Sequence, residues 1–393
     1  MRVEPCSLYI QAFSLLTCLE DDLQGVLAAD KSGMVLRDDL VHGQPLRFGT
    51  IRPGVLPEIP EGFPNVACNK ISLYCLGVLE DEIAGLLERY GKDRVGVVVG
   101  SSNAGIHETQ NAVDTFAASG CFPPWFSLSL LDIGLPSHFI AAYMGITGPA
   151  FTISTACTSS SKAFSAAARL IGTGACDAVI AGGVDPLCTY ASNGFYSLEA
   201  LSEGYSNPFS INRDGITIGE AGALFIVSRE KAPLKIAGIG ETSDAYHMTS
   251  PAPDGACAAA AMRMALDGAG IGPRDIGYVK LHGTGTKLND LAESNAVFDV
   301  FGDSVPCGSL KPLIGHTLGA CGAVELAHSC LLLDGSLNPE GNVPPHPWDG
   351  QPDPEIAPVH LSTGGRDPAL KNIILNTFAF GGSNVSMVLE REE

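Results

Sequence analysis

One cysteine and two histidines stand in segments whose residue types suit covalent chemistry. Cys157 lies in the turn Thr155–Ser161 (TACTSSS), between an extended apolar run and an alanine-rich run of helical spacing. This order of strand, turn and helix places Cys157 at a helix N-terminus, where free backbone N–H groups and the helix dipole favour a thiolate. We therefore expect a nucleophile of lowered pKa, and the alternative is a buried structural cysteine.

The two histidines each belong to a glycine-containing loop. His282 opens the segment His282–Thr286 (HGTGT) directly after a predicted strand, at the kind of strand end where α/β sheets hold ligands. His316 closes the segment Lys311–His316 (KPLIGH), which leads into a predicted helix over 323–333. Taken alone, either histidine suits a structural role as well as a functional one.

Charged residues accompany both histidine loops. Lys311 and Glu325 are expected to form a partly buried ion pair that holds the second loop. Asp290 and Glu293 lie near the start of the helix after the first loop, where they are either helix caps or supports of that loop.

Cys157, His282 and His316 together allow three interpretations. The first is nucleophilic thiol chemistry, with the histidines as hydrogen-bond donors or as base. The second is a Cys/His/His zinc site, which has suitable ligand types but lacks the local spacing of common zinc motifs. The third is a purely structural set.

The elements that must position these residues recur in two series. Three pairs of predicted strands follow one another in the same order: 95–99 with 276–281, 151–154 with 306–309, and 177–180 with 372–375. Their alternation with predicted helices, such as those over 19–29, 71–90 and 139–144, favours largely parallel sheets. We therefore predict an α/β protein of two similar halves, residues 1–235 and 236–393, whose loop ends meet at their interface.

Length, charge and cysteine usage exclude several classes of protein. A chain of 393 residues with 45% apolar residues can bury a large core, and its apolar runs are shorter than a membrane span. Its first residues are predicted to form a strand rather than a secretory signal. The net charge of −20 argues against nucleic acid and anionic membrane as partners. The twelve cysteines include no C-x-x-C pair, which favours a reducing compartment, and we expect a cytoplasmic protein.

Taken in chain order, these motifs resemble one family. Segments 155–160, 282–286, 311–316, 322–325 (GAVE) and 376–384 (NTFAFGGSN) are similar to those of the β-ketoacyl-acyl-carrier-protein synthases of the elongating type I/II kind. Segments 207–215 and 243–251 match the same family, so the resemblance runs from about residue 95 to residue 384. It implies the thiolase-like fold, a layered αβαβα arrangement with internal duplication, in agreement with the two series of strands.

The resemblance implies a decarboxylating condensation in which the three residues have separate roles. Cys157 accepts an acyl chain from a donor thioester. His282 and His316 flank the thioester carbonyl of a malonyl unit and stabilise the enolate that decarboxylation leaves. The enolate attacks the acyl-cysteine, and the product is a β-ketoacyl chain. The substrates are carried on the phosphopantetheine of an acyl carrier protein, and no metal or redox cofactor is expected.

Further residues receive roles from the same resemblance. The backbone N–H groups of Cys157 and Phe380 form an oxyanion hole, and Phe380 is also the gate of the acyl pocket. Lys311 and Glu325 organise the site, with Asp290 and Glu293 as supporting acids. Contacts with the substrate are expected from Thr284, Thr286, Phe195, Phe209, Gly381 and Gly382.

The resemblance also implies protein partners. We expect an acyl carrier protein, and either a homodimer or a heterodimer with a related ketosynthase-like subunit that helps close the acyl pocket. The alternative function is a non-catalytic, chain-length-factor-like subunit, although such subunits typically lack the nucleophile. Thiolase activity on free coenzyme A would need a second catalytic cysteine.

Two segments depart from the family pattern. Residues 66–70, where related chains are often rich in Arg and Lys, contain only one basic residue, Lys70, so the carrier docking surface is undefined. The segment after Gly100, often apolar in the family, carries Asn103, His107, Glu108 and Thr109. These side chains either face solvent or adapt the pocket to an unusual acyl chain, such as a conjugated or aryl-capped polyene. The pathway is accordingly fatty acid, aryl-polyene or polyketide biosynthesis.

Overall fold

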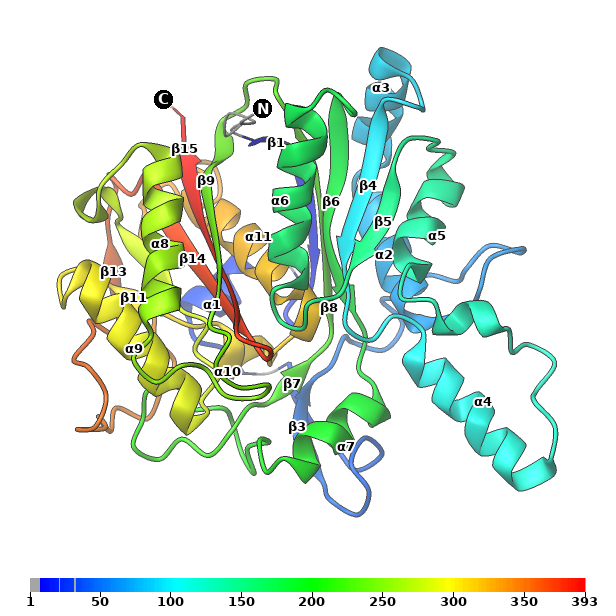
Figure 1. Cartoon of the computed structure of the whole chain (residues 1–393), viewed down its shortest axis with the longest axis horizontal. Helices are drawn as coiled ribbons and strands as arrows, with labels where there is room; N and C mark the ends of the chain where they lie inside the picture. The colour runs from blue at the N-terminus through cyan, green and yellow to red at the C-terminus, as the bar shows by residue number, and fades with distance from the viewer. Residues whose placement is uncertain (1–7, 21, 32, 393) are drawn as a thin grey trace.

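Two sets of five strands build the centre of the molecule. The computed structural model describes residues 8–20, 22–31 and 33–392 (Figure 1). The strands of the first set are β1 (Leu8–Leu16), β4 (Val95–Gly100), β5 (Ala150–Ile153), β6 (Ala178–Asp185) and β8 (Ala221–Ser228). Those of the second set are β9 (Leu234–Ser243), β10 (Tyr278–Lys280), β11 (Cys307–Gly308), β14 (Asn372–Ala379) and β15 (Ser383–Arg391).

The two sets have the same topology and join in one sheet. The spatial order is β11-β10-β14-β15-β9-β1-β8-β6-β4-β5. When the five strands of each set are numbered in chain order, both sets have the order 3-2-4-5-1 from the outer edge of the sheet to its centre. The strand pairs matched in the sequence occupy equivalent places, so the predicted internal duplication is confirmed. The division at residue 235 falls in the first residues of β9 and stays a prediction.

The expectation of largely parallel sheets is wrong for the middle of the molecule. The outer three strands of each set are parallel, as in the pairs of β4 with β5 and β6. The inner pairs are antiparallel, including the pair of β1 with β9 that joins the two sets. The short turn from β14 to β15 accounts for one of these pairs, because antiparallel neighbours need no crossover helix.

Helices form three layers around the strands, with two helices in the middle (Figure 1). The central helices are α6 (Ser159–Gly172) and α11 (Cys321–Leu333), and α11 is buried along its whole length. The first set is covered on its outer face by α2 (Ala67–Val78), α3 (Glu80–Tyr90) and α5 (Leu135–Met144). The second set is covered by α8 (Ala256–Ala269) and α9 (Lys287–Phe301). This is the predicted αβαβα layering.

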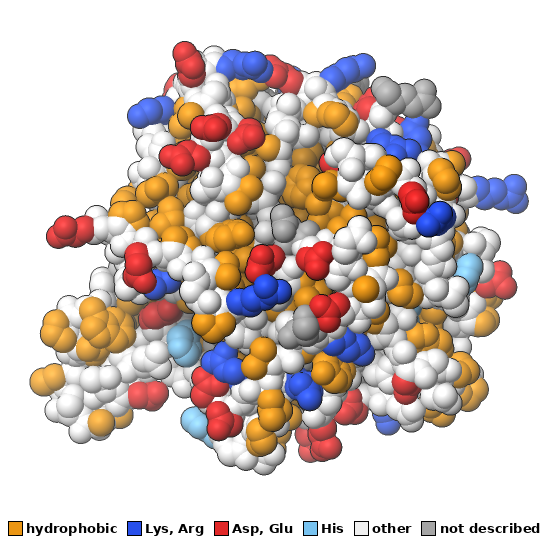
Figure 2. All heavy atoms as spheres, turned by 180° about the vertical axis from the view of Figure 1, so that it is seen from behind, with side chains coloured by type: hydrophobic (Ala, Val, Ile, Leu, Met, Phe, Trp, Pro, Cys, Tyr) orange, Lys and Arg blue, Asp and Glu red, His pale blue; other side chains and the backbone are white. Residues whose placement is uncertain are grey.

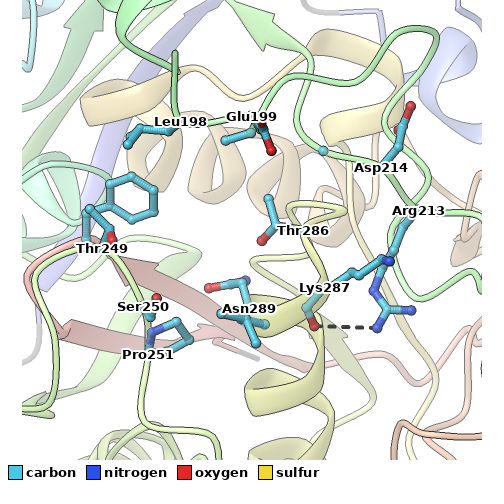
Figure 3. Close-up of a pocket in the computed structure, with 14 residues that line it drawn as sticks. Leu198, Glu199, Arg213, Asp214, Thr249, Ser250, Pro251, Thr286, Lys287 and Asn289 are labelled. Carbon is cyan, nitrogen blue, oxygen red and sulfur yellow. Dashed lines mark hydrogen bonds between the residues drawn. The ribbon is translucent and has the colours of Figure 1, made fainter. Parts of the chain in front are cut away.

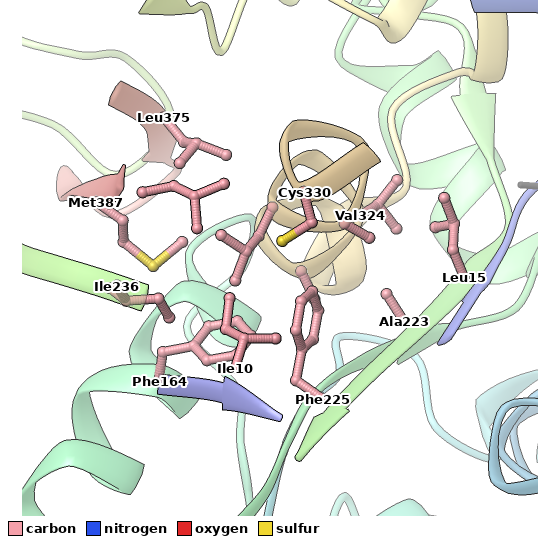
Figure 4. Close-up of a cluster of buried hydrophobic side chains, with 14 of the residues drawn as sticks. Ile10, Leu15, Phe164, Ala223, Phe225, Ile236, Val324, Cys330, Leu375 and Met387 are labelled. Atoms are coloured by element: carbon pink, nitrogen blue, oxygen red, sulfur yellow. The ribbon is translucent and has the colours of Figure 1, made fainter. Parts of the chain in front are cut away.

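The central layer is the largest hydrophobic core. Phe164 of α6 meets Phe225 of β8 edge to face, with ring centroids 5.2 Å apart. Val324 and Cys330 of α11 and Met387 of β15 pack in the same cluster (Figure 4). A helix that is apolar all round can exist only when other elements cover it on every side, as both strand sets do here.

The remaining elements are short or lie outside the layers. Two small sheets contain β2 (Met34–Arg37), β3 (Leu46–Gly49) and β7 (Ile218–Gly219), and β12 (Asn342–Pro345) with β13 (Thr363–Arg366). The other α-helices are α1 (Leu23–Leu27), α4 (Ile106–Ser119), α7 (Thr189–Ser197) and α10 (Lys311–Ile314), with 3₁₀ turns at Leu128–Leu131, Pro273–Asp275 and Leu318–Ala320. Helix α4 projects away from the body (Figure 1).

Two predicted helices differ from the observed ones. The helix expected over 19–29 is only α1, and residue 21 lies outside the described residues. The single helix expected over 71–90 is two helices that meet at Leu79. The acidic run Glu80-Asp81-Glu82 marks the start of the second helix, because carboxylates are favoured at a helix N-terminus. No described helix combines the length and apolar composition needed to cross a membrane.

Candidate active site

A strained turn presents Cys157 just ahead of helix α6. Ala156 has a φ of 53°, a left-handed conformation that is unusual for a residue with a Cβ atom. The Thr158 hydroxyl donates to the Thr155 carbonyl at 2.8 Å and fixes the turn. Gly100 at the end of β4 allows the first turn of α6 to approach, since a Cβ there would lie 2.2 Å from the Ser160 nitrogen. The thiol therefore has a fixed direction, toward the other half of the molecule.

His316 is in direct contact with this thiol. Its Nε2 lies 3.0 Å from Cys157 Sγ, and both side chains are buried. The backbone N–H of Leu318 donates to His316 Nδ1 at 3.2 Å, so in the neutral ring Nε2 carries the proton. Burial and the nearby Lys311 charge hold the pKa of His316 well below its usual range, so the ring is neutral. His316 is thereby arranged as a hydrogen-bond donor to sulfur rather than as a base.

His282 completes the group from the end of β10. Its ring stands at 86° to that of His316, with centroids 5.2 Å apart. Burial is the main cause that keeps the pKa of His282 well below its usual range, followed by the Lys311 charge. Its Nδ1 atom has no hydrogen-bond partner among the described residues. The pair thus presents two uncharged imidazoles beside one sulfur.

Two buried carboxylates hold the His282 loop through its backbone. Glu293 accepts the N–H groups of His282 and Gly283, both at 2.6 Å. Asp290 accepts the N–H groups of Gly285 at 3.1 Å and Phe209 at 2.8 Å. Burial raises the pKa of Glu293 to about 8 and that of Asp290 to about 6, while these N–H groups act in the opposite direction. Both acids stabilise the loop rather than cap their own helix.

Glu325 makes the expected ion pair with Lys311, but a second lysine is closer. Lys280 Nζ lies 3.0 Å from one oxygen of Glu325, and Lys311 Nζ lies 3.8 Å from the other. All three side chains are almost completely buried, not partly buried as expected. The sequence analysis missed Lys280, although a lysine at the end of a strand that is otherwise apolar was a usable signal.

The expected lowered pKa of Cys157 is wrong for the free protein. Burial of the thiol raises its pKa to about 11 and is the largest effect. The Lys311 charge lowers the pKa, as do the backbone N–H groups of Cys157 and Phe380, which point at the sulfur. Desolvation outweighs these groups, so the neutral thiol is the resting form. The two N–H groups remain in place for an oxygen that becomes negative during acyl transfer.

Asp185, at the end of β6, is a further buried acid that the sequence did not single out. It accepts hydrogen bonds from the Ser101 hydroxyl at 2.7 Å and from the Gly319 N–H at 2.6 Å. The N–H groups of Ser102 and Asn103 also donate to it, each at 2.8 Å. Asp185 therefore ties the loop after β4 to the loop that carries His316.

Phe380 lies between two cavities beside the site. Its ring packs on Phe195 of α7 with centroids 5.7 Å apart, and Gly381 and Gly382 follow it with φ values of 83° and 73°. One cavity, of about 640 Å³, lies between α4 and α7 and is lined by Gln110, Thr189 and Phe195 among others. Phe195 and Phe380 thus both line this cavity, and their roles as pocket wall and gate stay predictions.

The second cavity leads from the surface to the same phenylalanine (Figure 3). It has a volume of about 470 Å³, and Thr249, Ser250 and Thr286 line it. Thr284 is buried behind Thr286, with the two hydroxyl oxygens 3.0 Å apart. Phe209 is the exception among the predicted contacts, because its ring is completely buried in the core beneath α8 and α9. Its contribution is the backbone N–H that Asp290 accepts.

The polar residues after β4 do not simply face solvent. Asn103 is buried, and its side-chain amide donates to the Pro186 carbonyl at 3.0 Å. Glu108 accepts the Ala67 N–H at 2.8 Å. Three buried atoms of this segment, His107 Nδ1, Glu108 Oε2 and Thr109 Oγ1, have no hydrogen-bond partner among the described residues.

The zinc interpretation remains possible on geometry. The ligand atoms of Cys157, His282 and His316 lie within 4.8 Å of one another. A tetrahedral zinc ion would need all three within about 2.0–2.3 Å of one point.

Comparisons with known proteins extend these observations. The family described as "Beta-ketoacyl synthase, N-terminal domain" matches residues 78–232, and "Beta-ketoacyl synthase, C-terminal domain" matches residues 234–343. The 3-oxoacyl-[acyl-carrier-protein] synthase 2 of Staphylococcus aureus is 33% identical over 320 residues, which cover 77% of this chain and 76% of that protein.

Solved structures share the fold over nearly the whole chain. One chain from the complex of a ketosynthase with its chain length factor from Xenorhabdus doucetiae matches with a TM-score of 0.93 and 37% identity. The match covers 98% of this chain and 98% of that one. A β-ketoacyl synthase from Burkholderia phymatum matches with a TM-score of 0.85 and 26% identity, covering 99% of this chain and 100% of that one.

Proposed function

The chain belongs to the β-ketoacyl synthase family, and from this premise we propose that Cys157 carries the acyl chain while His282 and His316 act on the malonyl unit. The protein is a β-ketoacyl-acyl-carrier-protein synthase, an acyltransferase that condenses carrier-bound substrates. The assignment of individual residues to its steps rests on the geometry of the site.

In the first step, Cys157 Sγ attacks the carbonyl carbon of the donor thioester. A carbon–sulfur bond forms to Cys157, the bond to the pantetheine sulfur breaks, and the thiol proton leaves with the carrier thiol. The developing oxyanion lies against the N–H groups of Cys157 and Phe380, which already point at this place. Donation from His316 Nε2 stabilises negative charge on the sulfur as the proton departs.

In the second step, a malonyl thioester takes the place of the donor. Its carboxyl carbon–carbon bond breaks, CO₂ leaves, and the electron pair forms an enolate whose oxygen accepts hydrogen bonds from His282 and His316. The enolate carbon attacks the acyl-Cys157 carbonyl, the carbon–sulfur bond breaks, and the β-ketoacyl product remains on the carrier. The Cys157 thiolate that leaves takes up one proton from solvent and returns to the resting thiol. Neutral imidazoles can fill this role, because each carries one N–H group that can donate to the enolate oxygen.

The observation that carries this proposal is the contact of Cys157 Sγ with a proton-bearing His316 Nε2 at 3.0 Å, beside His282. The test is intact-mass analysis after incubation with a panel of acyl-carrier thioesters. The wild type should gain one acyl mass, and Cys157→Ala should gain none. Acylation of the Cys157→Ala variant at the wild-type level would overturn the assignment.

A non-catalytic partner subunit is the alternative function. Such a subunit would not need a thiol, two imidazoles and two backbone N–H groups converging on one point. The assembled group therefore favours the active enzyme. Condensation by the protein alone, or together with a subunit that lacks its own cysteine, would show that the chain is the active enzyme and not the non-catalytic subunit.

An acyl carrier protein is the proposed donor of both substrates, and it docks at the mouth of the 470 Å³ cavity. Exposed apolar side chains line it, namely Leu198 and Leu288, and exposed Met248 precedes the lining residue Thr249 in the chain. The charged groups there nearly cancel, because Glu199 and Asp214 accompany Lys287, and Arg213 is bound to Asp353 and Asp290. Lys70, the one basic residue of the segment 66–70, is paired with Glu58 at 3.7 Å. Docking is therefore mainly apolar.

A second subunit covers the face built by β5 and α4. Strand β5 is an outer edge of the sheet, and Phe151 on it is partly exposed. The lobe formed by α4 and the residues up to 131 carries hydrophobic side chains on its surface, at the lower left in Figure 2. Stacked rings of Phe116, Phe122 and Phe126 stiffen it, with successive centroids 4.6 Å apart. The solved ketosynthase and chain length factor complex supports a related subunit as partner, in a heterodimer or a homodimer, and the exposed edge and apolar surface are the reason for placing it on this face.

The acyl chain is proposed to be an unsaturated or polar one. Gln110 of α4 lines the 640 Å³ cavity, and the first turn of the same helix holds the unpartnered buried atoms of His107, Glu108 and Thr109. A polar helix beside the cavity favours a conjugated or aryl-capped chain, which is more polarisable than saturated hydrocarbon and can carry polar groups. Extension rates on saturated and polyenoyl carrier-bound primers test this, and a strong preference for saturated chains contradicts it.

The cytoplasm is the proposed compartment. All eleven cysteines within the described residues are unpaired, which suits a reducing environment.

A further inference from the structure

Glu325 is a single carboxylate that faces two buried ammonium groups. Lys280, the last residue of β10, places Nζ 3.0 Å from Oε2, and Lys311, the first residue of α10, places Nζ 3.8 Å from Oε1. The three side chains are at most 4% exposed. When both lysines are protonated, the cluster holds one positive charge in excess, which the protein interior screens poorly.

The two lysines compete for the carboxylate on unequal terms. Lys280 Nζ is at contact distance from Glu325 Oε2, whereas Lys311 Nζ lies beyond hydrogen-bond length from Oε1 and has no hydrogen-bond partner among the described residues. Glu325 is therefore held mainly by Lys280. The charge of Lys311 is the one left incompletely balanced.

Lys311 is also the charge that acts on the catalytic group. It is the strongest of the influences that lower the pKa of Cys157, and it lowers the pKa of His282 and His316 as well. Asp185 acts on Cys157 in the opposite direction, and the Cys321 thiol donates to the Cys157 carbonyl at 3.1 Å. If the charge of Lys311 is neutralised more completely, the pKa of Cys157 should therefore rise.

We propose that Lys280 is a positioning residue that holds Glu325 and so leaves the charge of Lys311 available to stabilise the Cys157 thiolate. The proposal rests on Cys157 being the nucleophile of the reaction. Without Lys280, Glu325 is free to turn to Lys311 and neutralise it. Lys280 itself touches no substrate.

One other titratable group faces Lys280. His328 lies one turn after Glu325 on α11, and burial with the Lys280 charge lowers its pKa to about 3. It is thus neutral at every pH of interest, and both ring nitrogens are without a hydrogen-bond partner in the described part of the chain. His328 does not compete for Glu325.

The test is the rate at which iodoacetamide alkylates Cys157, followed by peptide mass spectrometry between neutral and mildly alkaline pH. In this range the rate is proportional to the thiolate fraction, because burial raises the pKa of Cys157 to about 11. Lys280→Met should slow alkylation by about tenfold at each pH, which corresponds to a rise of about one pKa unit. Lys280→Arg keeps the charge and should retain the wild-type rate profile.

Two further variants make the outcome specific. In Lys280→Met with Glu325→Gln, no carboxylate remains to neutralise Lys311, and the rate should recover toward or above that of the wild type. Lys235→Met, which removes a lysine paired with Glu390 and Glu392 at the start of the central strand β9, should change nothing. Lys280→Gln carries the same test if the methionine variant does not fold.

A wild-type alkylation profile in folded Lys280→Met or Lys280→Gln overturns the proposal. So does a slowed rate that persists in the double variant, since Lys280 would then act through packing. Alkylation requires no condensation, so this result is independent of whether acyl transfer to Cys157 is confirmed.

Discussion

The floor beneath Cys157 and the face beside it are built on opposite plans. In the floor, five ionisable side chains are almost fully buried and bound to one another or to loop backbone: Lys280, Asp290, Glu293, Lys311 and Glu325. The face of β5 and α4 leaves large apolar side chains in water, with Trp125 55% and Leu128 75% exposed. The chemistry is thus fixed within one chain, whereas the surroundings of the acyl pocket await a neighbour.

Loss of one imidazole from the floor should have the largest effect. His316→Ala should lower the rate of malonyl decarboxylation by about 10²–10³-fold, as is typical for removal of one donor to a developing oxyanion. Cys157 should still be acylated, because its N–H groups and the Phe380 turn are unchanged. The measurement is CO₂ release from malonyl carrier beside intact mass after acyl transfer. Normal condensation in both His316→Ala and His282→Ala would refute the mechanism.

Weakening the support of the His282 loop should cost stability. Glu293→Gln leaves one of the two buried N–H groups facing the NH₂ group of the new side chain, which can donate but not accept. The free energy of unfolding should therefore fall by about 1–3 kcal/mol. Asp299→Asn on the same helix is the control, since its pair with Arg263 is exposed and should contribute less than about 1 kcal/mol. Denaturant unfolding measures both variants. Equal losses would mean that the floor is no more constrained than the surface.

A charge on the open face should weaken assembly without altering the floor. Phe151→Asp on β5 should raise the dissociation constant of the dimer by at least about tenfold, because it buries an unpaired carboxylate. Phe298→Asp on the outer helix α9, where the ring has a similar exposure, is the control and should leave assembly unchanged. Sedimentation velocity over a concentration series measures both. If Phe151→Asp assembles as the wild type does, the subunit contact lies elsewhere.

Salt should have little effect on docking of the carrier protein at the mouth of the cavity. Since Leu198 and Leu288 are exposed there and the charged groups nearly cancel, the KM for carrier-bound substrate should change by less than about twofold when ionic strength is raised from low to physiological. A strong loss of affinity with salt would instead indicate a basic docking patch, on this chain or on its neighbour.

Chelation should have no effect. Prolonged treatment with a strong zinc chelator should leave both condensation and thermal stability unchanged, because the mechanism uses Cys157, His282 and His316 without a metal ion. Loss of activity that added zinc restores would favour the Cys/His/His metal site.

The sequence predicted the residues of the site better than the state of those residues. Cys157, His282, His316 and Phe380 were identified because each lies in a short motif with glycine or small neighbours, and topology brings them together. The pKa of Cys157 was mispredicted, because the helix N-terminus is visible in sequence whereas the degree of desolvation is not. Phe209 was wrongly predicted to contact the substrate for the same reason, since an aromatic residue in a loop that matches the family can point to the core.

Long-range partners were the other part that sequence did not reveal. The contact of Lys280 with Glu325 spans β10 and α11, and Asp185 collects N–H groups from two distant loops. Neither has local spacing that marks it. The antiparallel centre of the sheet was likewise missed, because strand direction depends on connections whose path only the fold shows.

The pairing of β1 with β9 joins both halves in one continuous sheet, which opposes a hinge motion that would separate the Cys157 sulfur from the two imidazoles. Because Phe380 lines both cavities, a chain that occupied the two together would have to pass its ring. An electrophilic inhibitor aimed at Cys157 therefore has to be slender near its warhead, whatever its bulk farther out.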